Sequence, residues 1–158
     1  MTVDARPRFG TVEELLEEAR SRIDRLTPAQ AHEATAQGAT IVDIRPAWQR
    51  AVDGEVPGSL IVERNHLEWR LHPASDSRLA SAQASHRWIV LCTEGYTSSL
   101  AAASLRSLGI DTADVDGGIR AWRRAGLPIA AGPTPVETVV QPDRLTPLPQ
   151  TPTPTPTP

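Results

Sequence analysis

The sequence predicts an α/β fold in which an open, mostly parallel sheet carries helices on both faces. Short apolar runs rich in Ile, Val and Leu recur between residues 40 and 115, and they suit buried strands. Helical patterns separate these runs, and such an alternation of strands and helices is typical of a parallel sheet. The chain of 158 residues has room for one domain of ordinary size, with tails at its ends.

Four runs are expected to form strands, and the segments around them supply the helices. Strands are predicted at residues 40–44, 60–62, 88–91 and 112–115. Helices are predicted at residues 11–24, 27–35, 98–108 and 118–125. Thr27 and Pro28 indicate a helix start, because a hydroxyl cap precedes a proline in the first turn. Thr11 and Glu14 have the spacing of a capping box, and Gly109 is a typical helix terminator.

The composition divides the chain into three zones. Residues 1–25 form a helical extension, in which Leu15, Leu16 and Ala19 fall on one stripe that is expected to pack on the domain. Residues 26–131 form the domain itself. Residues 132–158 are rich in Pro and Thr and end in TPTPTPTP, which predicts an extended polyproline II tail without a core. We interpret this tail as solvated. The alternative is a protein partner bound through the tail or through the N-terminal helix.

Charge and residue content exclude several classes of protein. The net charge is −3 and no basic cluster occurs, so nucleic-acid binding is not expected. No apolar run approaches the ~20 residues of a membrane span, and residues 1–10 are polar, unlike a secretory signal. His66, Glu68 and His72 match no metal-binding spacing, and neither a metal nor another cofactor is expected. The single cysteine suits a thiol in a reducing cytoplasm.

Cys92 is the residue best suited to carry chemistry, because it directly follows the predicted central strand. Parallel open sheets bind ligands at the carboxyl ends of their strands. A helix begins about five residues later, so the loop between them can surround an anion with N–H groups, and Gly95 supplies the φ freedom for that curl. Ser98 and Ser99 are expected to cap the helix. A thiol placed there loses its proton more easily, although a lone cysteine is also often a small buried apolar residue.

The flanking residues favour the chemical interpretation, because four motifs occur in the order and spacing of one known family. The motifs are IVDIR at residues 41–45, GEVPGS at 54–59, VLC with its loop at 90–97, and DGGIRAW with GLP at 116–122 and 126–128. Over residues 25–130 the chain therefore resembles the rhodanese family of sulfurtransferases. Glu55 stands where the second motif usually has a histidine. The resemblance implies a rhodanese-like fold for residues 26–131.

The resemblance also implies a reaction and its residues. Cys92 would take a sulfane sulfur from thiosulfate or a persulfide and then pass it to a thiol or to cyanide. Arg45 is a candidate cation of the pocket, although pairing with Asp43 is the favoured interpretation. The transferred sulfur would be held mainly by the backbone of Thr93, Glu94, Gly95, Tyr96 and Thr97.

The side chains around the loop carry further expectations. The Glu94 carboxylate is expected to repel dianionic thiosulfate, which favours a persulfide as the donor. Trp48 and Tyr96 are candidates for the walls of the pocket. Residues 61–73 are expected to lie near the loop.

Two other functions compete with sulfur transfer. A cysteine phosphatase also uses a thiolate in a strand-to-helix loop, but it needs an arginine six positions after the cysteine to hold phosphate. Ser98 stands there, which speaks against that activity. The second competitor is a non-catalytic binding or sulfur-relay module of the same fold. The presence of Cys92 and Gly95 argues for chemistry, because a scaffold needs neither.

Overall fold

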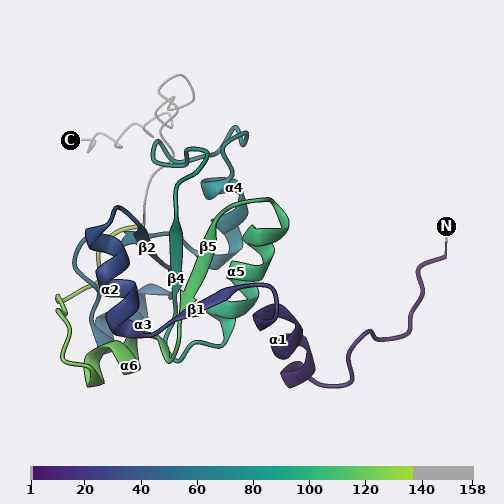
Figure 1. Cartoon of the computed structure of the whole chain (residues 1–158), viewed down its shortest axis with the longest axis horizontal. Helices are drawn as coiled ribbons and strands as arrows, with labels where there is room; N and C mark the ends of the chain where they lie inside the picture. The colour runs from purple at the N-terminus through teal and green to yellow at the C-terminus, as the bar shows by residue number, and fades with distance from the viewer. Residues whose placement is uncertain (1, 137–158) are drawn as a thin grey trace, which may run out of the picture.

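The computed structural model describes residues 2–136, and its centre is one sheet of five parallel strands (Figure 1). Their order across the sheet is β1-β5-β4-β2-β3. The strands are β1 (Asp24–Leu26), β2 (Thr40–Asp43), β3 (Leu60–Ile61), β4 (Trp88–Leu91) and β5 (Thr112–Val115). The predicted α/β class with a parallel sheet is therefore confirmed, and the WIVL segment forms the central strand as expected.

Helices cover both faces of this sheet (Figure 1). They are α1 (Val12–Arg20), α2 (Pro28–Ala36), α3 (Ala47–Asp53), α4 (Leu67–Leu71), α5 (Thr97–Ser107) and α6 (Gly118–Arg124), with a short 3-10 turn, η1 (Arg64–His66), before α4. Thr27 caps α2 with a complete capping box: its hydroxyl accepts the Gln30 N–H, and its own N–H donates to the Gln30 side chain. No helix of residues 2–136 has both the length and the apolar character to cross a membrane.

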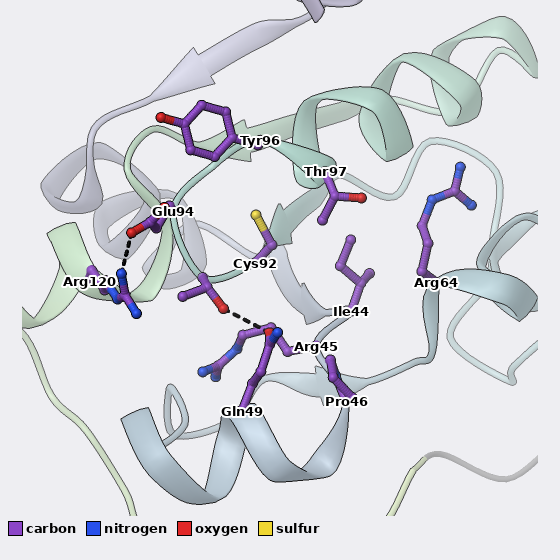
Figure 2. A pocket seen from close by; sticks show the side chains of 11 residues that line it. Ile44, Arg45, Pro46, Gln49, Arg64, Cys92, Glu94, Tyr96, Thr97 and Arg120 are labelled. Atoms are coloured by element: carbon purple, nitrogen blue, oxygen red, sulfur yellow. Dashed lines mark hydrogen bonds and ion pairs between the residues drawn. The ribbon is translucent and has the colours of Figure 1, made fainter. Parts of the chain in front are cut away.

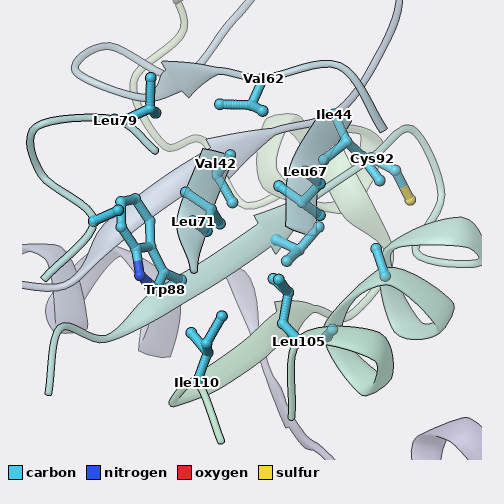
Figure 3. Packing of buried hydrophobic residues seen from close by; sticks show 14 residues of the cluster. Val42, Ile44, Val62, Leu67, Leu71, Leu79, Trp88, Cys92, Leu105 and Ile110 are labelled. Carbon is cyan, nitrogen blue, oxygen red and sulfur yellow. The ribbon is translucent and has the colours of Figure 1, made fainter. Parts of the chain in front are cut away.

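Alternating side chains of the central strands divide the core into two layers. Val42 and Val90 face α4 and α5 in one buried cluster (Figure 3). Ile41 and Ile89 belong to the opposite cluster, which α2 and α6 close. This period of two is what a parallel strand buried on both faces produces, and it explains why the strands read as continuous apolar runs. The carboxyl ends of the strands therefore lie between two firmly packed helical layers.

The N-terminal segment differs from its prediction in two ways. The first helix ends at Arg20 instead of residue 24, and Asp24–Leu26 forms edge strand β1 beside β5. The DRL sequence of this strand has no β-branched residue, so its pairing with β5 is a tertiary effect that local propensity does not show. Thr11 does cap α1, but the Glu14 carboxylate accepts the N–H of Gly10 at 2.8 Å, so only half of the predicted capping box forms.

The chain after α6 is fastened to the domain through a buried ion pair. Arg50 on α3 and Glu55 lie 2.7 Å apart and are both almost fully buried. Glu55 accepts the hydroxyl of Thr134 at 2.6 Å, and Arg50 donates to the Thr134 carbonyl at the same distance. Glu55 also forms an antiparallel bridge with Ala130. Residues 130–134 thus extend across the α3–β3 connection. Most of the segment expected to be a polyproline II tail, residues 137–158, lies outside the described residues.

Candidate active site

Cys92 lies directly after β4, at the carboxyl end of the centre of the sheet, beside a pocket of about 500 Å³ (Figure 2). Four other segments complete the wall of this pocket. They are the chain after β2, helix α3, the 3-10 turn η1 and the first turn of α6. The pocket therefore opens where the topology of a parallel sheet places ligands.

The Cys92 side chain is buried, and its sulfur accepts a hydrogen bond from the backbone of the loop. Cys92 is only 3% exposed, and its Sγ accepts the Gly95 N–H at 3.2 Å. The neighbouring amides have no acceptor among the described residues. These free donors are the N–H groups of Thr93, Glu94, Tyr96, Thr97 and Ser98. Free amides gathered in one loop at the start of a helix give that loop a positive polarity, which favours an anion beside Cys92.

Gly95 gives the loop its shape. Its φ of +86° lies in the left-handed region, and a Cβ there would stand 2.8 Å from the Gly117 nitrogen. The same N-terminus of α6 also holds the loop by hydrogen bonds, because the Ile119 N–H donates to the Cys92 carbonyl at 2.9 Å and the Arg120 N–H donates to the Thr93 carbonyl. The loop is thus held by backbone contacts with the start of α6, and only glycine fits at its tightest point.

Ser98 and Ser99 do not cap α5 as predicted. The N-cap residue is Tyr96, which makes no side-chain cap. Both serine hydroxyls instead donate to Oδ2 of Asp114 at 2.8 Å, in a fully buried contact between α5 and β5. A buried carboxylate needs hydrogen-bond donors, and this need outweighs local capping. Because the amides at the start of α5 keep no side-chain acceptor, they remain available to a ligand.

Arg45 is one of the residues that line the pocket, but its guanidinium is taken up by buried partners. It donates to the two carboxylate oxygens of Asp43 at 3.0 and 2.6 Å and to the Gly54 carbonyl at 2.8 Å. Arg45 is 2% exposed and Asp43 is fully buried. This pair ties the end of β2 to the α3–β3 connection, as the favoured interpretation of the sequence held. Tyr96 borders the pocket as expected, whereas Trp48 is exposed on α3 and is absent from the wall.

Three polar pocket residues were not identified from the sequence. Arg120 pairs with the Glu94 carboxylate at the mouth, Gln49 accepts the Thr93 hydroxyl at 2.8 Å, and Arg64 borders the opposite side (Figure 2). The expectation that residues 61–73 lie near the loop is confirmed by Arg64. The position of Arg120 in the DGGIRAW motif was a usable signal, because the start of α6 is joined to the loop by two hydrogen bonds.

The Glu94–Arg120 pair alters the expected electrostatics of the pocket. Glu94 was expected to repel an anionic donor, but its charge is offset by a guanidinium in contact with it. The pocket wall carries Arg45, Arg64 and Arg120 together with one carboxylate, Glu94, and Arg45 and Arg64 pair with Asp43 and Glu68 behind the wall. The basis for disfavouring thiosulfate is therefore weaker than the sequence suggested.

Comparison with known proteins gives consistent matches. A model of the rhodanese-like domain family matches residues 27–125. A thiosulfate sulfurtransferase, GlpE of Stutzerimonas stutzeri (strain A1501), is 38% identical over 100 residues, which are 63% of this chain and 84% of the relative. A solved structure from Rhodopseudomonas palustris CGA009, described as a protein of unknown function and possible tyrosine phosphatase, is 34% identical. It superposes with a TM-score of 0.71, covering 81% of this chain and 99% of its own.

A more distant structure shares the fold. The polysulfide-sulfur transferase of Wolinella succinogenes, solved as a homodimer, gives a TM-score of 0.62 at 20% identity. The match covers 76% of this chain and 87% of that protein.

Proposed function

Because the chain belongs to the rhodanese-like family, we propose that it is a sulfurtransferase in which Cys92 carries the transferred sulfur as a persulfide. The observation that supports this most is the group of free amides in the loop that follows Cys92, together with the Gly95 N–H that donates to its sulfur. A persulfide places a second, negatively charged sulfur beyond Sγ, and that charge needs donors already in position. The N–H groups of residues 93, 94 and 96–98 supply them without a cation at the sulfur itself.

The reaction proceeds in two displacement steps. The Cys92 thiolate attacks the sulfane sulfur of the donor, and a sulfur–sulfur bond forms as the donor's own bond to that sulfur breaks. The donor leaves with the electron pair, as sulfite when the donor is thiosulfate. An acceptor thiolate or cyanide then attacks the outer sulfur, and Cys92 leaves as the thiolate. No net oxidation or reduction of the protein occurs, so the reaction calls for no redox cofactor.

The pocket is compatible with two classes of donor. Arg64 and Arg120 at its wall favour an anion, which supports thiosulfate as a donor. The volume of about 500 Å³ also accommodates a larger low-molecular-weight persulfide. We keep both donors in the proposal. A thiol is the proposed acceptor, with cyanide as the laboratory substitute. A cytoplasmic location, where free thiols persist, fits such an acceptor.

A phosphatase activity lacks the group that it requires. The residue six positions after Cys92 is Ser98, whose hydroxyl is buried against Asp114. No guanidinium stands at the position from which a phosphatase loop holds phosphate in two places. The description of the Rhodopseudomonas palustris structure therefore does not extend to this chain.

The decisive experiment measures sulfur loading of the protein. The reduced protein is incubated with thiosulfate or, separately, with a low-molecular-weight persulfide, and its intact mass is recorded. We expect the addition of one sulfur atom, which dithiothreitol reverses and cyanide converts to thiocyanate. Cys92→Ser is the control and should take up none. Failure of wild type to load sulfur from either donor would exclude the proposal and leave a non-catalytic binding module.

A further inference from the structure

Two arginines that precede the family-matched residues converge on one carbonyl of the cysteine loop. Arg20, at the end of α1, donates from Nη2 to the Gly95 oxygen at 2.8 Å. Arg25, on β1, donates from its own Nη2 to the same oxygen at 2.9 Å. The family match begins only at residue 27. The extension thus places two positive charges against the loop that holds Cys92.

We propose that Arg20 and Arg25 are positioning residues, which fix and polarise the Gly95–Tyr96 peptide so that its N–H faces the transferred sulfur. The inference rests on the proposed sulfur transfer, because it assigns the two side chains a role in forming the persulfide. The Gly95 oxygen and the Tyr96 N–H belong to the same peptide group. Strong hydrogen bonds to the oxygen of an amide make its N–H a better donor.

The Tyr96 N–H is suited to this role because it has no acceptor in the described part of the chain. It lies one residue after the Gly95 N–H, which already donates to Cys92 Sγ. Two charge-assisted bonds on the Gly95 oxygen are shorter and stronger than neutral ones, so they hold this peptide in one orientation. The loop then presents its donors before the sulfur arrives, which is the condition for stabilising a developing negative charge.

The two arginines are themselves held by further partners, of which Asp114 and Ser99 are buried. Arg25 pairs with Asp114 at 3.0 Å, and Asp114 also accepts the hydroxyls of Ser98 and Ser99. Arg20 donates from Nε to Ser99 Oγ at 3.1 Å, and its guanidinium lies 5.7 Å from the ring of Tyr96. Side chains fixed in this manner form a rigid support for the loop. A simple attachment of α1 to the domain would need none of these contacts with Gly95.

Attachment of α1 is provided separately by Arg22. This residue donates to Ser107 Oγ at 3.0 Å and pairs with Glu18, so it joins the same two segments, α1 and α5, without touching the cysteine loop. Arg22→Gln is therefore the matched control. Arg20→Gln is the principal variant, because Arg20 has no carboxylate partner in residues 2–136 that would be left unpaired. Arg25→Lys keeps a charge beside Asp114 and serves as the second variant.

The experiment combines a rate with a spectroscopic signature. The rate constant for sulfur loading from thiosulfate is measured by intact mass for wild type and four variants, the fourth being Arg20→Lys. We expect Arg20→Gln and Arg25→Lys to load sulfur about tenfold more slowly, and Arg22→Gln to load it at the wild-type rate. The direct loss of an oxyanion-hole donor slows a reaction about 100-fold or more, and the effect here is smaller because the two arginines act through the Tyr96 N–H. Arg20→Lys should recover part of the rate. In the ¹H–¹⁵N spectrum the Tyr96 amide proton should shift upfield in Arg20→Gln and stay in place in Arg22→Gln.

Each outcome decides the proposal. Slower loading with the Tyr96 shift supports it. A wild-type rate in Arg20→Gln overturns it, even if the amide signal moves, and so does an equal loss of rate in Arg22→Gln. If wild type takes up no sulfur, the proposed function fails and the positioning role fails with it. If wild type loads and only the positioning prediction fails, sulfur transfer stands without the support of the two arginines.

Discussion

Arg120 on α6 pairs with the Glu94 carboxylate at the mouth of the Cys92 pocket (Figure 2). The two side chains are each about half exposed, at 51% and 48%, so solvent screens the pair only partly. Glu94 thus enters the pocket as one member of an ion pair and not as an isolated negative charge. The effect of either residue on an anionic donor depends on the other.

This coupling predicts the behaviour of a double-mutant cycle. Arg120→Gln leaves the Glu94 carboxylate unpaired, and we expect kcat/KM for thiosulfate to fall about threefold, the effect of ~0.7 kcal/mol for an exposed pair. Glu94→Gln alone should change it less than twofold in either direction, and the double variant should return close to wild type. Steady-state kinetics at low salt measure the four values. The differences in kcat/KM should shrink at 0.5 M NaCl, because the screening length is ~10 Å at about 0.1 M salt and becomes shorter as the salt concentration rises. Additive effects of the two substitutions would contradict the coupling.

The strands and the position of the cysteine could be predicted from the sequence, because the patterns that indicate them are local. Trp88–Leu91 is a continuous apolar run at the middle of the sheet, and Cys92 follows it directly. The positive φ of Gly95 was also predictable, because a loop that curls around an anion needs it. Strand β1 was missed because its three residues are held by pairing with β5, which is 86 positions or more away in the chain.

The charged residues that contact the cysteine loop could not be predicted from the sequence, because their partners are also distant in the chain. Arg20 and Arg25 contact the Gly95 carbonyl, which lies 75 and 70 positions along the chain. Every residue has a backbone carbonyl, so the sequence does not indicate which one accepts these hydrogen bonds. The expected capping role of Ser98 and Ser99 failed because Asp114, on another element, competes for their hydroxyls. Local rules assign side chains to their nearest backbone, whereas buried carboxylates take donors from wherever the fold supplies them.

Gly95→Ala should disable the site through backbone strain. The substitution meets both a φ of +86° and the Gly117 nitrogen 2.8 Å from the new Cβ, so the loop must move. We expect sulfur loading to slow at least 100-fold, as for loss of an oxyanion-hole donor, and stability to fall by about 2 kcal/mol.

Gly58→Ala is the matched control for Gly95→Ala, because Gly58 has a φ of +79° with nothing within 4 Å of a new Cβ. It should cost about 1 kcal/mol and keep the loading rate. Urea unfolding and intact mass separate the two effects, and equal loading rates for the two variants would disprove the role of the Gly95 turn.

Glu55 makes stability depend on pH in a direction that the structure sets. Burial raises the pKa of Glu55, but the hydrogen bonds from Thr134 and the bond and charge of Arg50 outweigh it, so the pKa lies below 4.5. A carboxyl whose pKa is lower in the folded than in the unfolded protein stabilises the fold at pH values above its unfolded pKa. This stabilisation is lost as the pH falls from 4.5 through the pKa of Glu55 in the folded protein. Glu55→Gln should lose about 3 kcal/mol at pH 7, because Arg50 is left buried without its charge partner.

Urea unfolding between pH 7 and pH 3 tests this contribution. The stability difference between wild type and Glu55→Gln should narrow as the pH falls below 4.5. Thr134→Val is the control, since it removes one hydrogen bond and keeps the Arg50–Glu55 pair. It should lose about 1 kcal/mol at pH 7, the usual value of one hydrogen bond. A difference for Glu55→Gln that is constant across this range would show that Glu55 is not the titrating group.

Arg64 should select for the charge of the sulfur donor. Its guanidinium pairs with Glu68 at 2.9 Å, yet it borders the pocket and its side chain remains 39% exposed. Burial raises the pKa of Glu68, but the hydrogen bonds from Ser104 and the backbone and the charge of Arg64 outweigh it, so the pKa is lowered. Glu68 therefore stays ionised and holds Arg64 at the rim of the pocket. Long-range attraction scales with the charge of the donor. Arg64→Gln should therefore reduce kcat/KM about threefold for dianionic thiosulfate, an exposed-charge effect, and less for a singly charged thiosulfonate.

The control for Arg64 is an arginine of the same region that does not border the pocket. Arg70 on α4 donates to the Ser77 carbonyl at 3.1 Å, so Arg70→Gln removes an equal charge away from the pocket wall. The ratio of kcat/KM for thiosulfate to that for the thiosulfonate should fall in Arg64→Gln and stay constant in Arg70→Gln. An equal fall in both variants would mean that the net charge of the protein attracts the donor. An unchanged ratio in Arg64→Gln would assign the selection to the loop amides, because the backbone donors remain intact in both variants.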